Sequence, residues 1–460
     1  MKKLQIGMII LFFLLLLLPI VFFNWEENVI SPIDNRMLTN NPFGENTDSS
    51  QKLTTRLENY VSDRIGFRSR MIEGYTDLND RLFHKMIHPL YEYGKDGYVF
   101  SKAKSNIVFS DYHRDFAEML AQIQSYCEQR GVPFLFVFNP EKAAVYTEYL
   151  ADGICYDNSW VQEFEAELER LGVHYIDNTQ LLREKKEAGE QVFNKQYNAG
   201  HWNDLGAFYG VNHILEELSK DFPSLQPNEK SDFAISEKLN ETLPSSTFPI
   251  AEYEPFFGRK TPLEVKTPEY DAEIVRNNQH RAFGYYINPE KVKEGAPKTL
   301  VFQGSYMNEM GFKFLQSGLG EYIYVHNYEN LLDFDYYFNI FQPECVIVEA
   351  AEYTINPTYF NQKGVKDFSL NPKLELQENA KQGQLSQLNL QLNQGEKITT
   401  LTAQIPQDTQ YAYLVVGETV FDCSVQPDGN ASISLENTDW NKEEASIVSV
   451  NFDGTQTVYR

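Results

Sequence analysis

The order of hydrophobic and polar residues divides the chain into three parts. An apolar run occupies residues 6–23, broken only by Gly7 and Pro19. Short apolar runs then alternate with amphipathic stretches from about residue 112 to residue 349. Beyond residue 371, Gln, Asn, Thr and Ser dominate around strand-like runs such as 411–416. The pattern predicts a membrane helix, an α/β domain and an all-β domain.

The middle part has the rhythm of βαβ units. Strands are expected at 133–138, 174–177, 299–302, 322–325 and 345–349, and helices at about 51–82, 112–130, 159–171, 204–219 and 308–317. Such alternation predicts a parallel sheet with helices on both faces. In these folds, ligand chemistry collects at the carboxyl ends of the strands.

The N-terminus predicts where the protein resides. Eighteen apolar residues can just span a bilayer, and Lys2 and Lys3 precede them while Glu26 and Glu27 follow. The positive-inside rule then leaves the body of the protein outside the cytoplasm. Because no small-residue cleavage pattern follows the run, we expect an uncleaved anchor that contacts the lipid bilayer through residues 6–23.

The expected domain boundaries follow from these changes in hydrophobicity and composition. We expect a cytoplasmic stub at 1–5, a transmembrane signal-anchor at 6–23 and a polar juxtamembrane linker at 24–50. An α/β domain at 51–365 contains an insertion at 223–297, which is rich in Pro, Glu, Lys and Asn and is expected to pass over the catalytic face. Residues 371–460 are expected to form a β-sandwich-like domain.

The net charge and the cysteine spacing limit which partners and metals the chain is expected to bind. A formal net charge of −25 disfavours nucleic acid, which needs basic patches. The four cysteines are far apart and lack metal-binding spacing, so neither zinc nor a disulfide is inferred.

One loop has residue types suited to acid–base chemistry. His201 stands in the polar stretch 197–203, just before the helix expected at 204–219, which Asn203 is suited to cap. A helix N-terminus lowers the pKa of a nearby histidine, which keeps the imidazole neutral, as a base must be near pH 7. A histidine in such a loop is equally compatible with a structural role.

A second segment has the order of a serine nucleophile. The strand expected at 299–302 is followed by Gly304 and then Ser305, at the mouth of the next helix. A hydroxyl on such a turn is exposed, and nearby backbone N–H groups can stabilise an oxyanion. Serine is also a favoured helix cap, which would need no chemistry.

Together these segments resemble the AlgX/AlgJ SGNH-hydrolase-like superfamily and the bacterial DHHW proteins, through most of residues 34–355. The motifs that carry the resemblance are Asp34-Asn-Arg36, Tyr60-Val-Ser-Asp-Arg-Ile-Gly-Phe-Arg68, Gly94-Lys-Asp-Gly-Tyr-Val-Phe100, Asn139-Pro-Glu-Lys142 ahead of Tyr146, Ala199-Gly-His-Trp202, Gln303-Gly-Ser305 and Gln342-Pro-Glu-Cys-Val-Ile-Val-Glu349. The resemblance implies a three-layer, flavodoxin-like parallel sheet in an extracytoplasmic protein.

The resemblance also implies a Ser-His-Asp triad. His201 and Trp202 match the family's Asp-x-His-Trp motif, and Ser305 matches the nucleophile. The aspartate position falls on Ala199, and the residue before the family serine, often Asp, is Gly304. Loss of a triad aspartate costs on the order of 10⁴ in rate in a serine protease.

Three explanations of Ala199 remain open at this point. Another residue could orient His201, the choices being Asp204, Asp177 or the uncharged Asn198. A Ser-His dyad could act at reduced rate. The domain could instead have lost catalysis and kept carbohydrate binding.

The leading prediction is a single-pass cell-membrane protein that transfers or removes acetyl esters on a cell-surface polysaccharide. Ser305 would be acylated and His201 would be the base, with no metal or diffusible cofactor. Substrate contacts are expected from Trp202, Lys142, Tyr146 and Tyr306. The resemblance implies a multi-pass membrane acyltransferase as acetyl donor. The alternatives are a catalytically degenerate polysaccharide-binding or assembly module of the cell envelope, and a helper of teichoic-acid D-alanylation.

Overall fold

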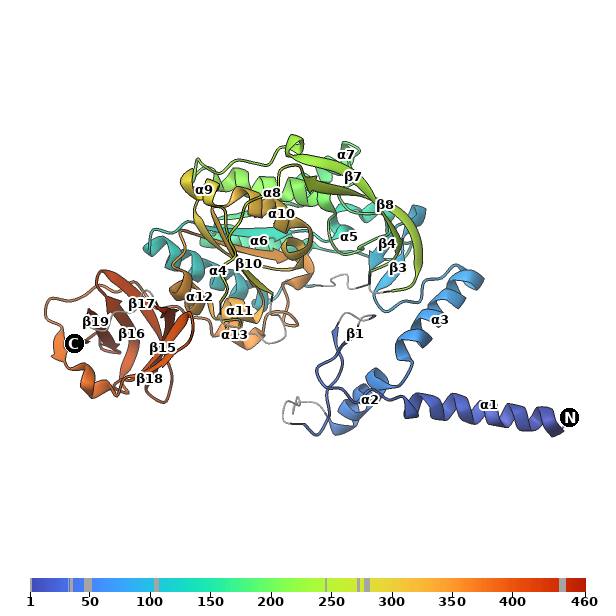
Figure 1. Ribbon diagram of the computed structural model, residues 1–460, viewed down its shortest axis with the longest axis horizontal. Coiled ribbons are helices and arrows are strands. Elements are labelled where there is room, and N and C mark those ends of the chain that lie inside the picture. Colours follow the sequence, from blue (N-terminus) through green and yellow to red (C-terminus); the bar gives the residue numbers. More distant parts are fainter. Residues whose placement is uncertain are drawn as a thin grey trace.

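The computed structural model describes residues 2–31, 33, 36–44, 52–102, 107–244, 246–270, 274–276, 282–437 and 444–460. Its helices and strands form an apolar N-terminal helix, an α/β domain and a C-terminal β-rich domain (Figure 1). The fold class predicted from the sequence is thereby confirmed. Part of the Asp34-Asn-Arg36 motif and of the linker at 24–50 lies outside the described residues.

The α/β domain is built on a six-stranded sheet in the order β6-β5-β12-β10-β11-β9. Five strands are parallel, and only the edge strand β9 is antiparallel. The strands are β5 (Phe134–Asn139), β6 (Tyr175–Asp177), β9 (Phe283–Ile287), β10 (Lys298–Gln303), β11 (Glu321–His326) and β12 (Cys345–Ala351). The five expected strands are therefore present, each displaced by at most two residues at either end.

Helices cover both faces of this sheet. Side chains alternate along β5, so Phe134 and Phe136 pack with α4 and α12 while Leu135 and Val137 pack with α8 and α10. Figure 1 shows α8 and α10 on one side of the sheet and α4 and α12 on the other. The helices of the domain are α4 (Asp111–Gln129), α5 (Lys142–Val145), α6 (Ser159–Leu171), α7 (Thr179–Glu187), α8 (Asp204–Leu218), α9 (Pro289–Lys293), α10 (Phe312–Gly318), α11 (Glu329–Leu332), α12 (Phe334–Phe341) and α13 (Gln362–Lys366).

The insertion expected at 223–297 is more regular than the sequence suggested. It contains the antiparallel hairpin β7 (Phe233–Thr242) and β8 (Pro249–Arg259), and it supplies the edge strand β9. The sequence did not predict these strands because β7 is exposed along most of its length and therefore lacks an apolar pattern. A second small hairpin, β3 (Tyr91–Tyr93) with β4 (Val99–Ser101), lies beside the start of the domain.

The N-terminal segment forms three helices rather than two. α1 spans Lys2–Val21, and within the described residues its segment Leu4–Val21 alone has the length and apolarity to cross a membrane, a test that a signal sequence also passes. The helix expected at 51–82 is divided into α2 (Leu53–Arg64) and α3 (Arg68–Phe83). A short pair, β1 (Ile30–Ser31) with β2 (Arg36–Met37), lies between α1 and α2.

The C-terminal strands form a continuous hydrogen-bonded order, β13-β20-β19-β16-β17-β18-β15-β14. Their bounds are β13 (Lys381–Gly383), β14 (Gln391–Gln394), β15 (Ile398–Gln404), β16 (Thr409–Val416), β17 (Thr419–Val425), β18 (Asn430–Glu436), β19 (Ala445–Asn451) and β20 (Gln456–Tyr459). A separate apolar cluster, which includes Leu401, Leu414 and Ile433, fills this domain. Asp422 of β17 joins it to the α/β domain by accepting a hydrogen bond from Arg130 at 2.8 Å.

Candidate active site

Ser305 and His201, which are far apart in the sequence, meet at the carboxyl end of β10. Ser305 Oγ lies 2.7 Å from His201 Nε2. Ser305 follows the end of β10 by two residues and begins the helical segment that continues through a π-helical turn, Met307–Gly311, into α10. Both side chains line a cleft of about 570 Å³. π-helical turns are often found at functional sites.

Asn198 orients the imidazole. Its Oδ1 lies 2.8 Å from His201 Nδ1, and its Nδ2 donates a hydrogen bond to Glu309 Oε2 at 3.1 Å. Because a carboxylate only accepts, the amide nitrogen must face Glu309 and the amide oxygen must face His201. His201 therefore donates from Nδ1, which leaves the Nε2 lone pair free to accept the proton of Ser305.

The protonation state of His201 suits a base. Burial lowers its pKa below the ordinary value of 6.5, and the carboxylate of Glu309 opposes this shift without cancelling it. The imidazole is therefore neutral at pH 7. Glu309 had no part in the sequence prediction, although it lies four residues after Ser305 and a helix brings residues four apart to one face.

A third hydroxyl belongs to the same cluster. Tyr353 Oη lies 3.2 Å from Ser305 Oγ and 3.4 Å from His201 Nε2. Burial raises the pKa of Tyr353, so its hydroxyl stays protonated and can donate. Tyr353 follows the end of β12, and nothing in its local sequence distinguishes it from the other tyrosines of the chain.

A buried carboxylate fixes the turn that carries the serine. Glu349 of β12 accepts from the backbone N–H of Gly304 at 2.7 Å and from Asn139 Nδ2 at 2.8 Å. Burial raises the pKa of Glu349 to about 7. A Cβ on Gly304 would lie 3.6 Å from Glu349 Oε2. A side chain at position 304 would therefore begin beside both this carboxylate and the amide group of Asn327.

The histidine loop is held by the insertion. Glu252 of β8 accepts hydrogen bonds from the backbone N–H groups of Lys195, Gln196 and Tyr197, at 2.5, 2.7 and 2.5 Å. Three donors on one carboxylate fix the entry to Asn198, whose φ of 48° is left-handed. Asparagine tolerates that conformation better than most residues.

Ala199 packs in an apolar cluster. It is 2% exposed and its neighbours are Met86, Tyr91, Val99, Leu243 and Phe248. An aspartate in its place would lose hydration among apolar side chains. The site has changed in two ways relative to the resembled motif, because position 199 has become apolar and Asn198 contacts the histidine instead.

The other two candidate partners of His201 bond elsewhere. Asp204 Oδ2 accepts from the backbone N–H of Phe257 at 2.8 Å and pairs with the ammonium group of Lys313. Asp177 Oδ1 accepts from the backbone and the hydroxyl of Thr179 at 2.8 and 2.5 Å. Neither Asp204 nor Asp177 therefore orients His201, because each carboxylate is already bound by other groups.

Of the four expected substrate contacts, Trp202, Tyr306 and Tyr146 are buried in the core, and Lys142 lines the cleft. Trp202 is fully buried and donates from Nε1 to the carbonyl oxygen of Tyr306 at 3.1 Å. Tyr306 is buried beneath His201, with its hydroxyl 2.7 Å from the carbonyl oxygen of Gly200. Tyr146 is 2% exposed inside the core that includes Phe193.

Lys142 lines the cleft, but its ammonium group points into the protein. Its ammonium group donates to the carbonyl oxygens of Val99 and Lys195 at 2.7 and 2.9 Å. Burial lowers its pKa to about 7. The aromatic side chains that line the cleft in place of the expected ones are Tyr91, Phe100, Tyr328, Tyr353 and Tyr359.

The rim of the cleft includes residues that precede the α/β domain. Ile30, Arg36 and Met37 line it. Arg36 is bound by Asp63 of α2 through two hydrogen bonds of 2.6 and 2.9 Å. Burial disfavours the Asp63 anion, but the bonds from Arg36 and Thr39 outweigh this and lower its pKa.

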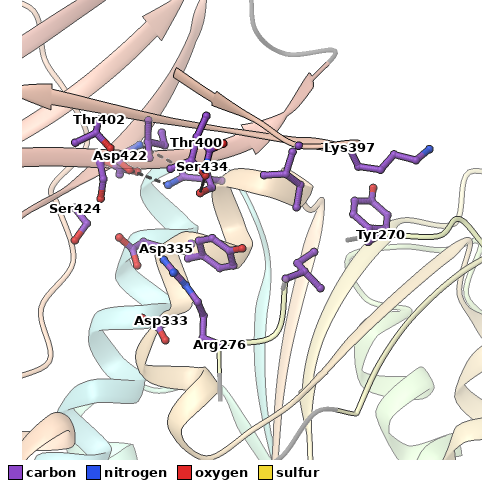
Figure 2. Close-up of a pocket in the computed structure, with 18 of the residues that line it drawn as sticks. Tyr270, Arg276, Asp333, Asp335, Lys397, Thr400, Thr402, Asp422, Ser424 and Ser434 are labelled. Atoms are coloured by element: carbon purple, nitrogen blue, oxygen red, sulfur yellow. Dashed lines mark hydrogen bonds between the residues drawn. The ribbon is translucent and has the colours of Figure 1, made fainter. Parts of the chain in front are cut away.

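A second cavity of about 1000 Å³ lies between the α/β domain and the C-terminal domain. Figure 2 shows hydroxyl side chains of the C-terminal strands, labelled Thr400, Thr402, Ser424 and Ser434, opposite Asp335 and Arg276 of the α/β domain. Burial raises the pKa of Asp335 to about 6. Among the described residues that line this cavity there is no histidine, so these residues do not form a serine–histidine pair like that of the first cleft. In the part of the chain described here, no group of three or more His, Cys, Asp and Glu side chains is arranged to hold a metal ion.

Comparison with solved structures gives several likenesses at low identity. The O-acetyltransferase domain of Pseudomonas putida AlgJ is 17% identical, covering 61% of this chain and 99% of that one, with a TM-score of 0.41. A DHHW family protein from Eubacterium siraeum is 15% identical, covering 62% and 100%, with a TM-score of 0.41. Pseudomonas aeruginosa AlgX is 14% identical, covering 80% and 89%, with a TM-score of 0.38.

Comparison with curated protein sequences gives no match. A family model does match, over a span that includes the His201 loop and ends before Ser305. The pairing of these two residues is therefore known from the geometry of this chain and not from the family model. The resemblance inferred from the motifs is confirmed by the match of residues 92–292 to the family described as SGNH hydrolase-like domain, acetyltransferase AlgX.

Proposed function

We propose that this protein transfers acetyl groups to, or removes them from, a cell-surface polysaccharide, with Ser305 as nucleophile and His201 as general base. The observation that carries the proposal is the 2.7 Å contact between Ser305 Oγ and His201 Nε2, with Nδ1 of the same ring held by Asn198. A nucleophile, a base and a group that orients the base are the minimum for acyl transfer through a covalent intermediate.

The proposed reaction has two halves. Ser305 Oγ attacks the carbonyl carbon of an acetyl donor while its proton passes to His201 Nε2. The tetrahedral intermediate collapses, His201 gives that proton to the leaving group, and acetyl-Ser305 remains. A sugar hydroxyl then loses its proton to His201, attacks the acetyl-serine, and leaves as the acetyl ester while Ser305 regains the proton. Water in place of the sugar would complete hydrolysis.

The oxyanion would form where positive partial charge is available. Ser305 begins a helical segment, and the first N–H groups of a helix have no partner within it. The protonated hydroxyl of Tyr353, 3.2 Å from Ser305 Oγ, is a further donor at this point. Glu349 stabilises the turn from below through the N–H of Gly304. We propose that these groups act in place of the strong electrostatic support that a triad aspartate would give.

The membrane part of the proposal rests on α1. We propose that it anchors the chain as a single-pass helix, with the cleft outside the cytoplasm and a multi-pass membrane acyltransferase as the source of acetyl groups. The family description matched by residues 92–292 names an acetyltransferase, which supports the reaction class.

Labelling by a fluorophosphonate tests the nucleophile directly. The wild-type protein should be labelled on Ser305, while Ser305→Ala and His201→Ala should not. Ser219→Ala serves as a matched control, since Ser219 is also a helix-end serine but is far from the cleft in the chain. Absence of labelling in a folded wild-type protein would reject the serine mechanism.

A second role, polymer binding, is supported by the cavity in Figure 2. Its walls carry hydroxyl, amide, carboxylate and guanidinium groups, which is the chemistry that hydrogen-bonds sugar hydroxyls. If the chain were only a binding module, retention of envelope polymer on immobilised protein would fall in Asp335→Ala and be unchanged in Ser305→Ala. If it is an enzyme, Ser305→Ala would also abolish the change in acetyl content.

A further inference from the structure

Helix α3 exposes an apolar stripe to the surroundings. Its members within the helix, Met71, Tyr75, Leu78 and Leu82, recur every three or four residues and lie on one side within about 60° of arc, and Phe67 precedes them as the N-cap residue. Phe67, Met71, Tyr75, Leu78 and Leu82 are 41, 47, 57, 52 and 63% exposed. A stripe of this kind ordinarily faces a core, but here Thr76 and Asn79, on a different side of α3, are the buried residues. Within the described residues, most of the stripe is therefore left uncovered.

The stripe begins where α1 ends. The backbone N–H of Gly66 donates to the carbonyl oxygen of Pro19 at 2.8 Å, and the N–H of Asn24 donates to that of Arg64 at 2.8 Å. The rings of Phe22 and Phe67 lie 4.9 Å apart. A Cβ on Gly66 would lie 2.6 Å from the carbonyl oxygen of Phe22, so only glycine permits this approach.

A buried arginine fixes this junction. Arg64, 1% exposed, donates to the carbonyl oxygens of Thr39, at 2.6 Å, and Glu26, and to Asn40 Oδ1 at 3.0 Å. These acceptors lie on the chain that leaves α1. The start of α3 is thus held against the end of α1, and Figure 1 shows both helices on the side of the molecule away from the C-terminal domain.

The residues around the junction suit a lipid–water boundary. Trp25, directly after the apolar helix, is 72% exposed, and tryptophan is enriched at membrane interfaces. Charged residues of α3, among them Arg70, Glu73, Asp77 and Arg81, occupy a face beside the stripe. A helix with one apolar and one charged face lies in the interface with its apolar side toward the acyl chains.

We propose that α3 lies in the outer interface of the bilayer that α1 spans, with the stripe Phe67, Met71, Tyr75, Leu78 and Leu82 against lipid. The proposal rests on the proposed anchoring by α1. It commits to a lipid surface because the stripe is continuous with the end of an apolar helix that is itself exposed along its length.

One consequence concerns the cleft. Its rim residues Ile30, Arg36 and Met37 belong to the segment between α1 and α2, and Arg36 is tied to α2 through Asp63. A membrane-bound α3 would hold this segment, and with it the mouth of the cleft, close to the bilayer surface. An acetyl donor delivered from the membrane would then have a short path to Ser305.

The test uses the full chain in pure phospholipid vesicles with single nitroxide labels. Cys155, the exposed cysteine, is first replaced by serine, and the other three cysteines are buried. Labels are placed through Leu78→Cys on the stripe, Asp77→Cys on the neighbouring charged face, and Leu14→Cys within α1. Thermal unfolding of each variant verifies that it is folded. Collisions with oxygen, which concentrates in lipid, are compared with collisions with a water-soluble nickel chelate.

The proposal predicts that labels at 78 and 14 collide more with oxygen, while the label at 77 collides more with nickel. If the label at 14 is in lipid but the label at 78 is as accessible to nickel as the label at 77, the proposal for α3 is overturned while the anchoring by α1 stands. The stripe would then be expected to bind a protein partner. If 14 is also in water, the anchoring itself fails. Leu78→Glu offers a second arm, since it should reduce penetration of a label at 71 without moving one at 14.

Discussion

At the scale of single residues, the site depends on Asn198. This uncharged side chain makes the contact with His201 that the resembled motif would give to an aspartate. Asn198 gives His201 the correct tautomer but no negative charge, and the nearest carboxylate, Glu309, acts through the Asn198 amide. An anion in direct contact would stabilise the imidazolium that forms when Ser305 is deprotonated. We therefore expect a working but slow base, whose strength can be changed in both directions by substitution.

Glu309→Gln should weaken the base. Loss of the Glu309 charge removes the influence that raises the pKa of His201, so the acid limb of kcat/KM should move to lower pH. The plateau should fall by up to about tenfold, because the neutral glutamine accepts a weaker hydrogen bond from Asn198 than the carboxylate does. Measurement of kcat/KM for an acetyl ester from pH 4 to 8 checks both effects, and Glu329→Gln, outside the cleft, is the control. An unchanged profile would remove Glu309 from the account.

Asn198→Asp combined with Glu309→Gln should do the opposite. The new carboxylate would contact His201 Nδ1 directly, while the neutral amide at position 309 would avoid repulsion between two acids 3.1 Å apart. The pKa of His201 should rise, so the acid limb should move up by about one pH unit or more, and the plateau should increase. Asn198→Asp alone should gain less, because Glu309 would then oppose ionisation of the aspartate. A double variant no faster than wild type would show that orientation, not charge, limits the reaction.

At the scale of elements, the insertion between α8 and β10 holds the loop that carries His201. Glu252 of β8 binds three consecutive N–H groups just before Asn198, and Phe248 belongs to the apolar cluster that contains Ala199. A hairpin that the sequence pattern would place outside the core therefore sets the position of His201. The π-helical turn does the same for Glu309, which it places beside Asn198.

Glu252→Gln should loosen that loop. A glutamine retains only one acceptor oxygen, so at least one of the three N–H groups loses its hydrogen-bond partner. This loss should lower the free energy of unfolding by about 1–3 kcal/mol. We expect a lower melting temperature, faster hydrogen exchange at residues 195–197, and a larger fall in kcat than rise in KM. Glu241→Gln, an exposed acid on β7, is the matched control. Equal effects from both variants would contradict a specific role of Glu252.

The sequence could predict the elements with strong periodicity and the residues with local signals. All five parallel strands follow from apolar runs of strand length, whereas the meeting of His201 with Ser305 was implied by the family resemblance and not by the pattern of either segment alone. Glu252, Tyr353 and Glu349 could not be assigned in this way, because their roles come from long-range contacts. The burial of Trp202 and Tyr306 depends on packing that no local pattern reveals.

At the scale of the whole molecule, several buried acids make a contribution to stability that falls as pH rises. Burial raises the pKa of Glu349 and Glu352 to about 7 and that of Asp335 to about 6. The folded state therefore holds these protons more tightly than the unfolded chain. Their contribution is full below pH 4, near the unfolded pKa values of 3.8 and 4.5, and is lost as pH rises through 6 to 7.

The protein should accordingly melt at a higher temperature at pH 5 than at pH 8. The raised pKa of Glu349 alone corresponds to about 3 kcal/mol between those limits. Glu349→Gln, which cannot ionise, should reduce the difference between the two pH values, while Glu344→Gln on the surface should not. Melting curves at both pH values provide the measurement, and a wild type more stable at pH 8 would contradict this reading of the buried acids.

The central claim is that Ser305 carries the acetyl group during the reaction, and its acetylation can be observed. The purified full chain is mixed with p-nitrophenyl acetate, quenched in acid within the first turnover, digested and analysed by mass spectrometry. The account predicts that the peptide containing Ser305 gains the mass of one acetyl group in wild type and not in His201→Ala. Release of p-nitrophenol with no acetyl group on Ser305 would contradict it.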